Sequence, residues 1–139
     1  MIAEHADRYE LQLGGFRVTR WAVDFALTLY LDKPRAETKE PRLDAEIRVE
    51  GRFSYENANS RIEIDPQHEP AALAPILALR GQCLESATVT KAGELELRFQ
   101  NGARIRVYSG TKYEAWTLNA PGGVLIVGGV NGMVSIFRP

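Results

Sequence analysis

The same pattern of three strands occurs twice along this chain. Each copy begins with a glycine, continues with an apolar strand and an alternating strand, and ends with an Ala-x-Ile-Arg-Val strand. The copies run over about residues 15–55 and 81–118. Alternation with a period of two is typical of strands that bury one face. Because neither copy can cover its own apolar face, we expect a single domain over residues 1–139, with pseudo-symmetric antiparallel sheets.

One short helix is expected between the two copies, which makes the predicted fold mainly β within the α+β class. Asp65 can cap such a helix with Pro66 in its first turn, and a start nearer Pro70 is the alternative. Pro75 is tolerated only near a helix start, so the regular part must be short. Gly81 stands where a left-handed cap belongs at the end of the helix.

The remaining pattern predicts further strands and one charged loop. Residues 9–13 are expected to form a first strand, and residues 61–64 a short edge strand. Residues 124–129 and 133–137 are apolar on both faces, which favours central positions in a sheet. Residues 32–42 contain two prolines and several charged side chains, so they are expected to form a solvated loop.

The hairpin before Tyr108 can be put in register from its sequence. A two-residue loop would place Arg98 opposite Ile105 and would mix charged and apolar residues on one face. A three-residue loop over residues 100–102 instead places Leu97 opposite Ile105. Such a loop needs a left-handed residue, and Gly102 meets that need.

The other face of this hairpin is predicted to be charged. There Glu96 lies opposite Arg106, and Arg98 lies opposite Arg104. Like charges across a strand pair destabilise it unless an anion or carboxylate lies nearby. A solvated face of mixed charge is one interpretation. A docking surface for a protein with an acidic surface is the other, and its binding residues would be Glu96, Arg98, Arg104, Arg106, Glu114 and Trp116.

The composition excludes several classes of protein. Lys and Arg number 17 against 18 Asp and Glu, which gives a net charge of −1, so no nucleic-acid partner is expected. Residues 1–8 are charged and lack the apolar core of a signal peptide, so a flexible tail is expected. No apolar run is long enough to span a membrane. The single cysteine, Cys83, excludes an intramolecular disulfide and fits the cytoplasm.

No residue pattern indicates catalysis, a metal or a cofactor. His5 and His68 have no further ligand residues at the spacing of a metal site. Cys83 opens a predicted strand, where buried packing is the usual role. An enzyme that uses carboxylates such as Asp24 and Glu114 is the lowest-ranked hypothesis, because Asp24 is also well placed to hydrogen-bond within a turn.

Residues 113–116 read Tyr-Glu-Ala-Trp and follow the strand over residues 95–99 and its hairpin. Together with the glycine-led strand and the helix after Asp-Pro, this order resembles a bacterial family catalogued only as a domain of unknown function. The resemblance covers most of residues 15–137. It implies no activity, but some members resemble the immunity proteins encoded beside bacterial toxins. The resemblance therefore implies an immunity or regulatory role through protein binding.

Two questions stay open from the sequence. In a continuous strand, Glu114 and Trp116 share a face, which is either the core or a recognition surface. The leading function is non-enzymatic protein binding, which a filled core and a flat charged face would favour. The alternative is a small-ligand domain with a pocket between the sheet and the helix, near Trp21 and Trp116.

Overall fold

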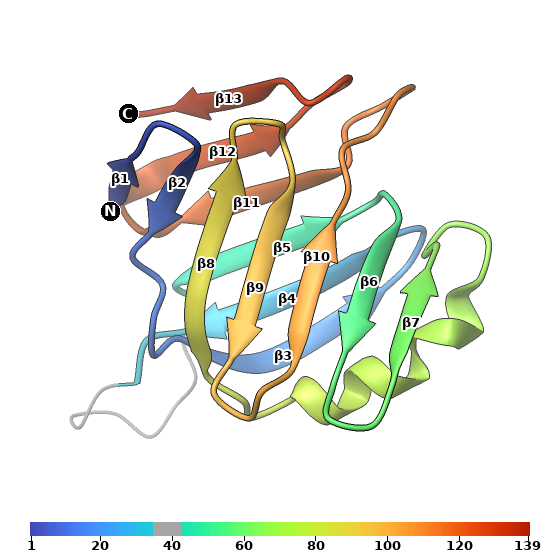
Figure 1. Cartoon of the computed structure of the whole chain (residues 1–139). Helices are drawn as coiled ribbons and strands as arrows, with labels where there is room; N and C mark the ends of the chain where they lie inside the picture. Colours follow the sequence, from blue (N-terminus) through green and yellow to red (C-terminus); the bar gives the residue numbers. More distant parts are fainter. Residues whose placement is uncertain (35–42) are drawn as a thin grey trace.

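Alternating strands form two antiparallel sheets in the computed structural model, which describes residues 1–34 and 43–139 (Figure 1). The seven-stranded sheet contains, in spatial order, β1 (Ile2–Glu4), β2 (Arg8–Leu11), β8 (Leu84–Thr90), β9 (Leu95–Phe99), β10 (Arg104–Val107), β6 (Phe53–Glu56) and β7 (Arg61–Ile64). The six-stranded sheet contains β13 (Val134–Phe137), β12 (Val124–Gly128), β11 (Trp116–Ala120), β5 (Ala45–Val49), β4 (Leu27–Asp32) and β3 (Arg17–Val23). The predicted mainly β fold with antiparallel sheets is confirmed.

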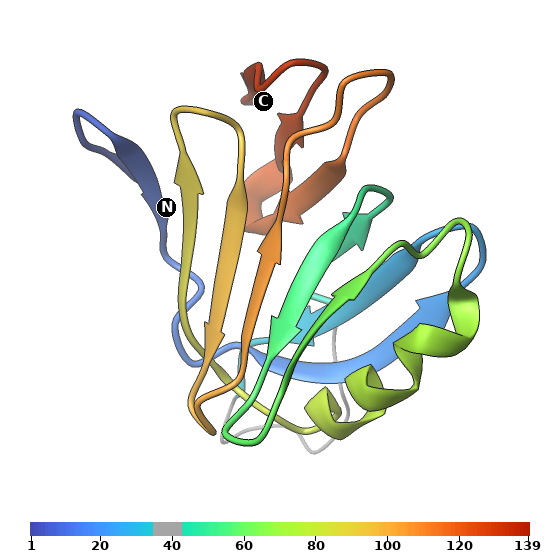
Figure 2. The same cartoon turned by 45° about the vertical axis from the view of Figure 1, so that its right-hand side comes forward.

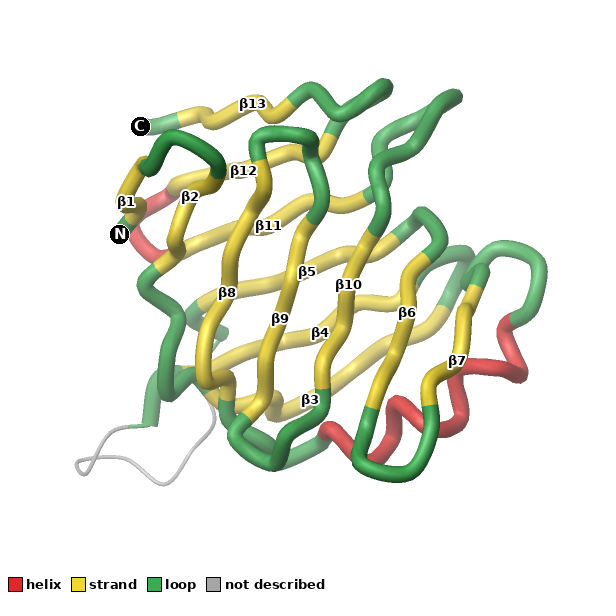
Figure 3. The backbone as a smooth tube through the Cα atoms, viewed as in Figure 1, coloured by secondary structure: helices red, strands yellow, loops and turns green. Residues whose placement is uncertain are grey.

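The two sheets pack face to face, and their strands cross at a wide angle (Figure 1, Figure 3). Alternation along each strand produces the core between them. On β9, for example, Leu95, Leu97 and Phe99 are buried, whereas Arg98 is exposed. One continuous cluster of buried side chains draws on both sheets and on the helix between the halves. Burial of this shared apolar surface stabilises the sandwich.

Both halves of the chain follow the same order of strand pairing. In the first half, β3, β4 and β5 pair in sequence, and β6 then crosses to the other sheet. In the second half, β8, β9 and β10 pair in sequence, and β11 crosses in the opposite direction. The crossing strands complete the exchange, because β6 pairs with β10 and β11 pairs with β5. A superposition of the two halves remains a prediction of the repeat.

Reciprocal backbone hydrogen bonds join the segments that begin the two halves. The bonds are Gly15 N–H to Leu84 O (2.7 Å), Gly81 N–H to Val18 O (2.7 Å), Val18 N–H to Gln82 O (2.9 Å) and Leu84 N–H to Phe16 O (2.7 Å). Each donor and acceptor on one side has its counterpart at the same position of the other half. Gly15 and Gly81 both have φ +85°. The register also shifts at the same place in each half, between Val18 and Arg20 and between Leu84 and Ser86.

The helix between the halves is the 3₁₀ helix η1 (Pro70–Leu79), so the start near Pro70 is the correct alternative. Pro75 lies in its middle, where it has no N–H to donate. Gly81 has the expected positive φ. A second 3₁₀ turn, η2 (Pro121–Gly123), links β11 to β12. Among the described residues, no helix is both long enough and apolar enough to cross a membrane.

Two expectations about the sheet edges are wrong. Strand β13 stands at one end of the six-stranded sheet formed by the described residues, so it is an edge strand, although β12 and β13 are apolar. Residues 1–8 are not a free tail, because β1 pairs with β2 and Ile2 packs against the core. Residues 61–64 form the edge strand β7 as predicted. The loop predicted over residues 32–42 falls outside the described residues between 35 and 42.

The predicted hairpin register is confirmed. Leu97 lies opposite Ile105, and Arg98 lies opposite Arg104. Gly102 has φ +90°, and no neighbouring atom lies within contact distance of a Cβ built on it. The need for glycine here is therefore conformational and not steric.

Replacing Gly102 with valine should lower the free energy of unfolding by about 1 kcal/mol or more, because a β-branched residue resists a left-handed backbone. Gly102→Asn is the matched control, since asparagine adopts this conformation at lower cost. Urea unfolding of both variants measures the difference. An equal loss for asparagine and valine would contradict the conformational explanation.

Candidate functional site

The outer face of the seven-stranded sheet carries the charged residues predicted for binding. Glu96 and Arg98 come from β9, and Arg104 and Arg106 come from β10. Their backbone neighbours point inward and are buried, so these four side chains lie on the outside of the sheet. We call these four residues the arginine–glutamate face.

Each arginine of this face has a carboxylate partner. Arg98 Nε donates to Glu96 Oε1 (2.7 Å), and Arg106 Nη2 donates to Glu96 Oε2 (3.1 Å). Arg104 Nη2 donates to Glu56 Oε2 (3.1 Å). The repulsion expected between Arg98 and Arg104 is therefore offset by separate ion pairs. Glu56 was not foreseen as a partner, because only the crossing of β6 brings it beside β10.

Glu96 is the electrostatic centre of the face. Its side chain is only 14% exposed, and burial alone would raise its pKa. The hydrogen bonds from Arg98 and Arg106 outweigh that effect, so the pKa of Glu96 lies below the usual glutamate value. The carboxylate is thus held ionised between two guanidinium groups.

The charged network continues to the sheet edge. Tyr108 Oη donates to Glu63 Oε1 (3.0 Å), and Arg61 Nη2 donates to Tyr108 Oη (3.3 Å). Arg61 lies opposite Glu56 on β6, which connects this group to Arg104. No pattern in the sequence predicts this extension, since it depends on the pairing of β6 with both β7 and β10.

Trp116 is a core residue, so the exposed alternative for it is wrong. It is 0% exposed, and its Nε1 donates to the carbonyl oxygen of Gly93 (3.0 Å). A Cβ on Gly128 would overlap the indole, so glycine there makes room for the ring. Glu114 is exposed and precedes β11, so it does not share a strand face with Trp116. The structure does not place Trp116 with the arginine–glutamate face.

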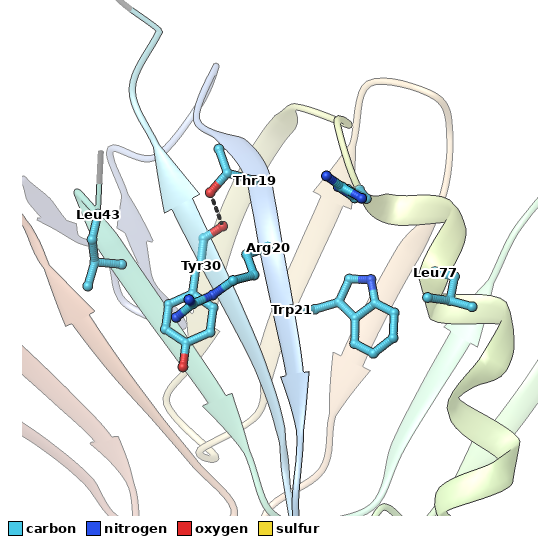
Figure 4. Close-up of a pocket in the computed structure, with 7 residues that line it drawn as sticks. Thr19, Arg20, Trp21, Tyr30, Leu43 and Leu77 are labelled. Atoms are coloured by element: carbon cyan, nitrogen blue, oxygen red, sulfur yellow. Dashed lines mark hydrogen bonds between the residues drawn. The ribbon is translucent and has the colours of Figure 1, made fainter. Parts of the chain in front are cut away.

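A depression of about 710 Å³ lies beside Trp21, and we call it the Trp21 pocket. Its lining residues come from β3, β4, η1 and the segment before β5, and they are Thr19, Arg20, Trp21, Tyr30, Leu43, Leu77 and Arg80. Figure 4 shows Arg20 and Tyr30 on one side of β3 and Trp21 turned toward Leu77 on the other. The pocket expected near Trp21 is present, but Trp116 does not line it.

Thr19 and Arg20 are fixed by contacts with Tyr30. The Arg20 guanidinium lies 4.1 Å from the centre of the Tyr30 ring. The Thr19 hydroxyl donates to the Tyr30 carbonyl oxygen (3.3 Å). The register shift between Val18 and Arg20 adds a residue at this point of the strand, and such bulges change the direction of neighbouring side chains.

The other sequence candidates have structural roles or stand apart. Asp24 Oδ1 accepts from the Ala26 N–H (2.8 Å), and this bond and the pairing with Arg48 lower the pKa of Asp24. The predicted turn role of Asp24 is therefore confirmed. His68 contacts Asp65 (2.8 Å), and Cys83 is half-buried. In residues 1–34 and 43–139, no three His, Cys, Asp or Glu side chains are grouped so that they could hold a metal ion.

Residues 9–138 match the model of a family of unknown function, DUF6188, and the chain belongs to this family. No curated protein and no solved structure matches the chain. The family match agrees with the predicted membership of an uncharacterised family. It assigns no activity, so function has to be argued from the surfaces described above.

Replacing Trp116 with phenylalanine should lower the free energy of unfolding by about 1 to 3 kcal/mol, because it leaves the buried Gly93 carbonyl without its donor and creates a void. Trp21→Phe, at a half-buried site, should cost less than about 1 kcal/mol. Urea unfolding compares the two. Equal losses would mean that Trp116 is not the core anchor.

Glu96→Gln should lower the free energy of unfolding by about 1 kcal/mol at neutral pH. Since the folded-state pKa of Glu96 is depressed, the stabilisation is fully present above about pH 4.5 and is lost as the pH falls through the folded-state pKa. The difference from wild type should therefore shrink in acid. Glu114→Gln, at an exposed position, is the control, and a loss that does not depend on pH would refute the role given to Glu96.

Proposed function

We propose that this DUF6188 protein is a non-enzymatic domain that binds another protein through the arginine–glutamate face. The observation that carries the proposal is a charged outer face on a sheet whose inner face is filled by core side chains. Such a face offers area and a charge pattern for a protein partner. The depression beside Arg98 and Arg104 measures only about 220 Å³, which is smaller than a typical small-molecule site. The expected partner carries acidic groups.

The existing ion pairs leave the guanidinium groups able to bind a partner. Arg104 uses Nη2 for Glu56, and Arg98 uses Nε for Glu96. A guanidinium has five N–H donors, so further donors remain for a partner's carboxylates. Each arginine is already positioned by a carboxylate, so its side chain loses less entropy when a partner binds. Exposed charges such as these arginines contribute more to the association rate and the specificity of a complex than to its affinity.

An immunity or regulatory protein is the specific form of this proposal. Both roles require a stable domain that covers part of another protein without catalysis. The family resemblance supports a partner encoded nearby, such as a bacterial toxin. The cytoplasm is the proposed compartment, supported by the single cysteine.

Affinity capture from the native host tests the surface. The baits are wild type, the double variant Arg98→Gln and Arg104→Gln, and the control Arg48→Gln and Arg138→Gln. The control removes the same charge, and Arg48 is also paired with carboxylates, but it lies on the six-stranded sheet. A partner should be captured by wild type and control, and largely lost with the Arg98 and Arg104 variant, more strongly at low salt.

Recovery of the same proteins by all three baits would contradict the proposed surface. Thermal unfolding of each bait is the accompanying check. The Arg98 and Arg104 variant should unfold within a few degrees of wild type, because pairs this exposed contribute about 0 to 1 kcal/mol each. Loss of binding can then be attributed to the surface and not to unfolding.

A further inference from the structure

The Trp21 pocket lies where the two halves of the chain differ, at the element that covers the edge of the first strand of each half. In the second half, β8 is covered along its free edge by β2, which pairs Leu11 with Ala87 and Arg8 with Thr90. The corresponding strand of the first half, β3, is the last strand of its sheet in the part of the chain that the structure describes. The segment that leads into the second half forms η1 instead, which lies next to β3 and closes that end of the sandwich (Figure 2). The helix does not pair with the edge of β3 as a strand would, and a depression of about 710 Å³ remains beside β3.

Among the described residues, the lining of this pocket is cationic, because it contains two arginines and no Asp or Glu. Neither Arg20 nor Arg80 forms an ion pair with a described residue, and Arg20 instead lies over the Tyr30 ring. Most other arginines of the described residues do pair with carboxylates, and these are Arg8, Arg17, Arg48, Arg61, Arg98, Arg104 and Arg106. Glu46 lies opposite Tyr30 on β5, so Tyr30 stands between that carboxylate and Arg20.

The rest of the described lining is mainly apolar or aromatic. Trp21 is only half-buried, although β3 places it opposite the buried Leu29. Leu77 is 51% exposed on the helix side, toward which the indole turns (Figure 4). The Tyr30 ring holds the Arg20 guanidinium in place, which reduces the entropy lost when that group binds an anion. An indole and a leucine left open to water would both gain from contact with an apolar ligand.

From these features we infer that the Trp21 pocket binds a small organic anion with a flat aromatic body. Because Arg20 and Trp21 lie on opposite sides of the edge strand β3 (Figure 4), the ligand would lie across the free edge of this strand. A carboxylate, sulfonate or phosphate group would contact the Arg20 and Arg80 guanidiniums, which favour such oxyanions. The aromatic body would cover Trp21 and Leu77. The volume is that of a site for a small molecule, which ranges over about 300 to 1,000 Å³. This site is separate from the arginine–glutamate face and does not rest on the function proposed for it.

Anilinonaphthalene sulfonate is a suitable probe, because it combines an aromatic body with one anionic group. Its neutral relative, phenylnaphthylamine, has nearly the same body without the charge. Fluorescence titration of the folded wild type should show saturable binding of the sulfonate at one site per chain. The neutral compound should bind at least about tenfold more weakly, since it lacks the charge-assisted hydrogen bonds to both arginines.

Three glutamine variants locate the site. Arg20→Gln and Arg80→Gln should each weaken binding of the sulfonate by about tenfold and leave binding of the neutral compound unchanged. Arg52→Gln is the matched control, because Arg52 also has no ion pair with a described residue but lies outside the pocket. All three residues are exposed, so folding should be preserved, and circular dichroism verifies this. In nuclear magnetic resonance spectra, the indole N–H signal of Trp21 should shift on binding and that of Trp116 should not.

Several results would overturn the inference. One is equal binding of the two compounds, and another is loss of binding in Arg52→Gln to the same extent as in the pocket variants. A third is a shift of the Trp116 signal without one at Trp21. A polyglutamate peptide that binds in an Arg20-dependent way, while the sulfonate does not bind, would assign the pocket to an acidic peptide and reject the small anion.

Discussion

The reciprocal backbone hydrogen bonds between residues 15–18 and 81–84 are the constraint on which the rest of the structure depends. They join the start of β3 to the start of β8, although these strands belong to different sheets. Each half then adds two strands beside its own first strand and sends a fourth strand across to the other sheet. The apolar faces of both sheets are thereby closed over one core. At the far end, the bond from Trp116 to Gly93 ties the six-stranded sheet to the β8–β9 turn.

Strand periodicity and turn chemistry are sufficient to predict the features of this fold that depend on residues close together in the sequence. The three-residue hairpin loop, the facing of Leu97 and Ile105, and the positive φ of Gly81 all follow from periodicity and turn chemistry. Pairings between distant segments could not be predicted, since alternation says which face is buried and not which strand lies alongside. For that reason the sequence did not identify Glu56 as the partner of Arg104, and it placed β13 centrally when it is an edge strand.

The same distinction applies to the candidate sites. Arg98, Arg104 and Arg106 could be assigned to one outer face from the hairpin register alone. Trp116 could not be assigned, because its burial depends on Gly93 and Gly128 from other turns and strands. The Trp21 pocket arises where the two halves differ, with β2 beside β8 and η1 beside β3. At this difference the structure leaves a half-buried tryptophan beside Arg20 and Arg80, which have no ion pair with a described residue.

Hydrogen exchange of backbone amides tests the central claim most directly. The amides of Gly15, Val18, Gly81 and Leu84 are the four donors that join the two halves. If these bonds hold the sheets together, all four amides should exchange slowly and to a similar degree, at rates close to those of core amides such as that of Ile105, because they are released only when the whole domain unfolds. Fast exchange of these four amides while the core strands stay protected would contradict the account, since the sheets would then be held together without the junction.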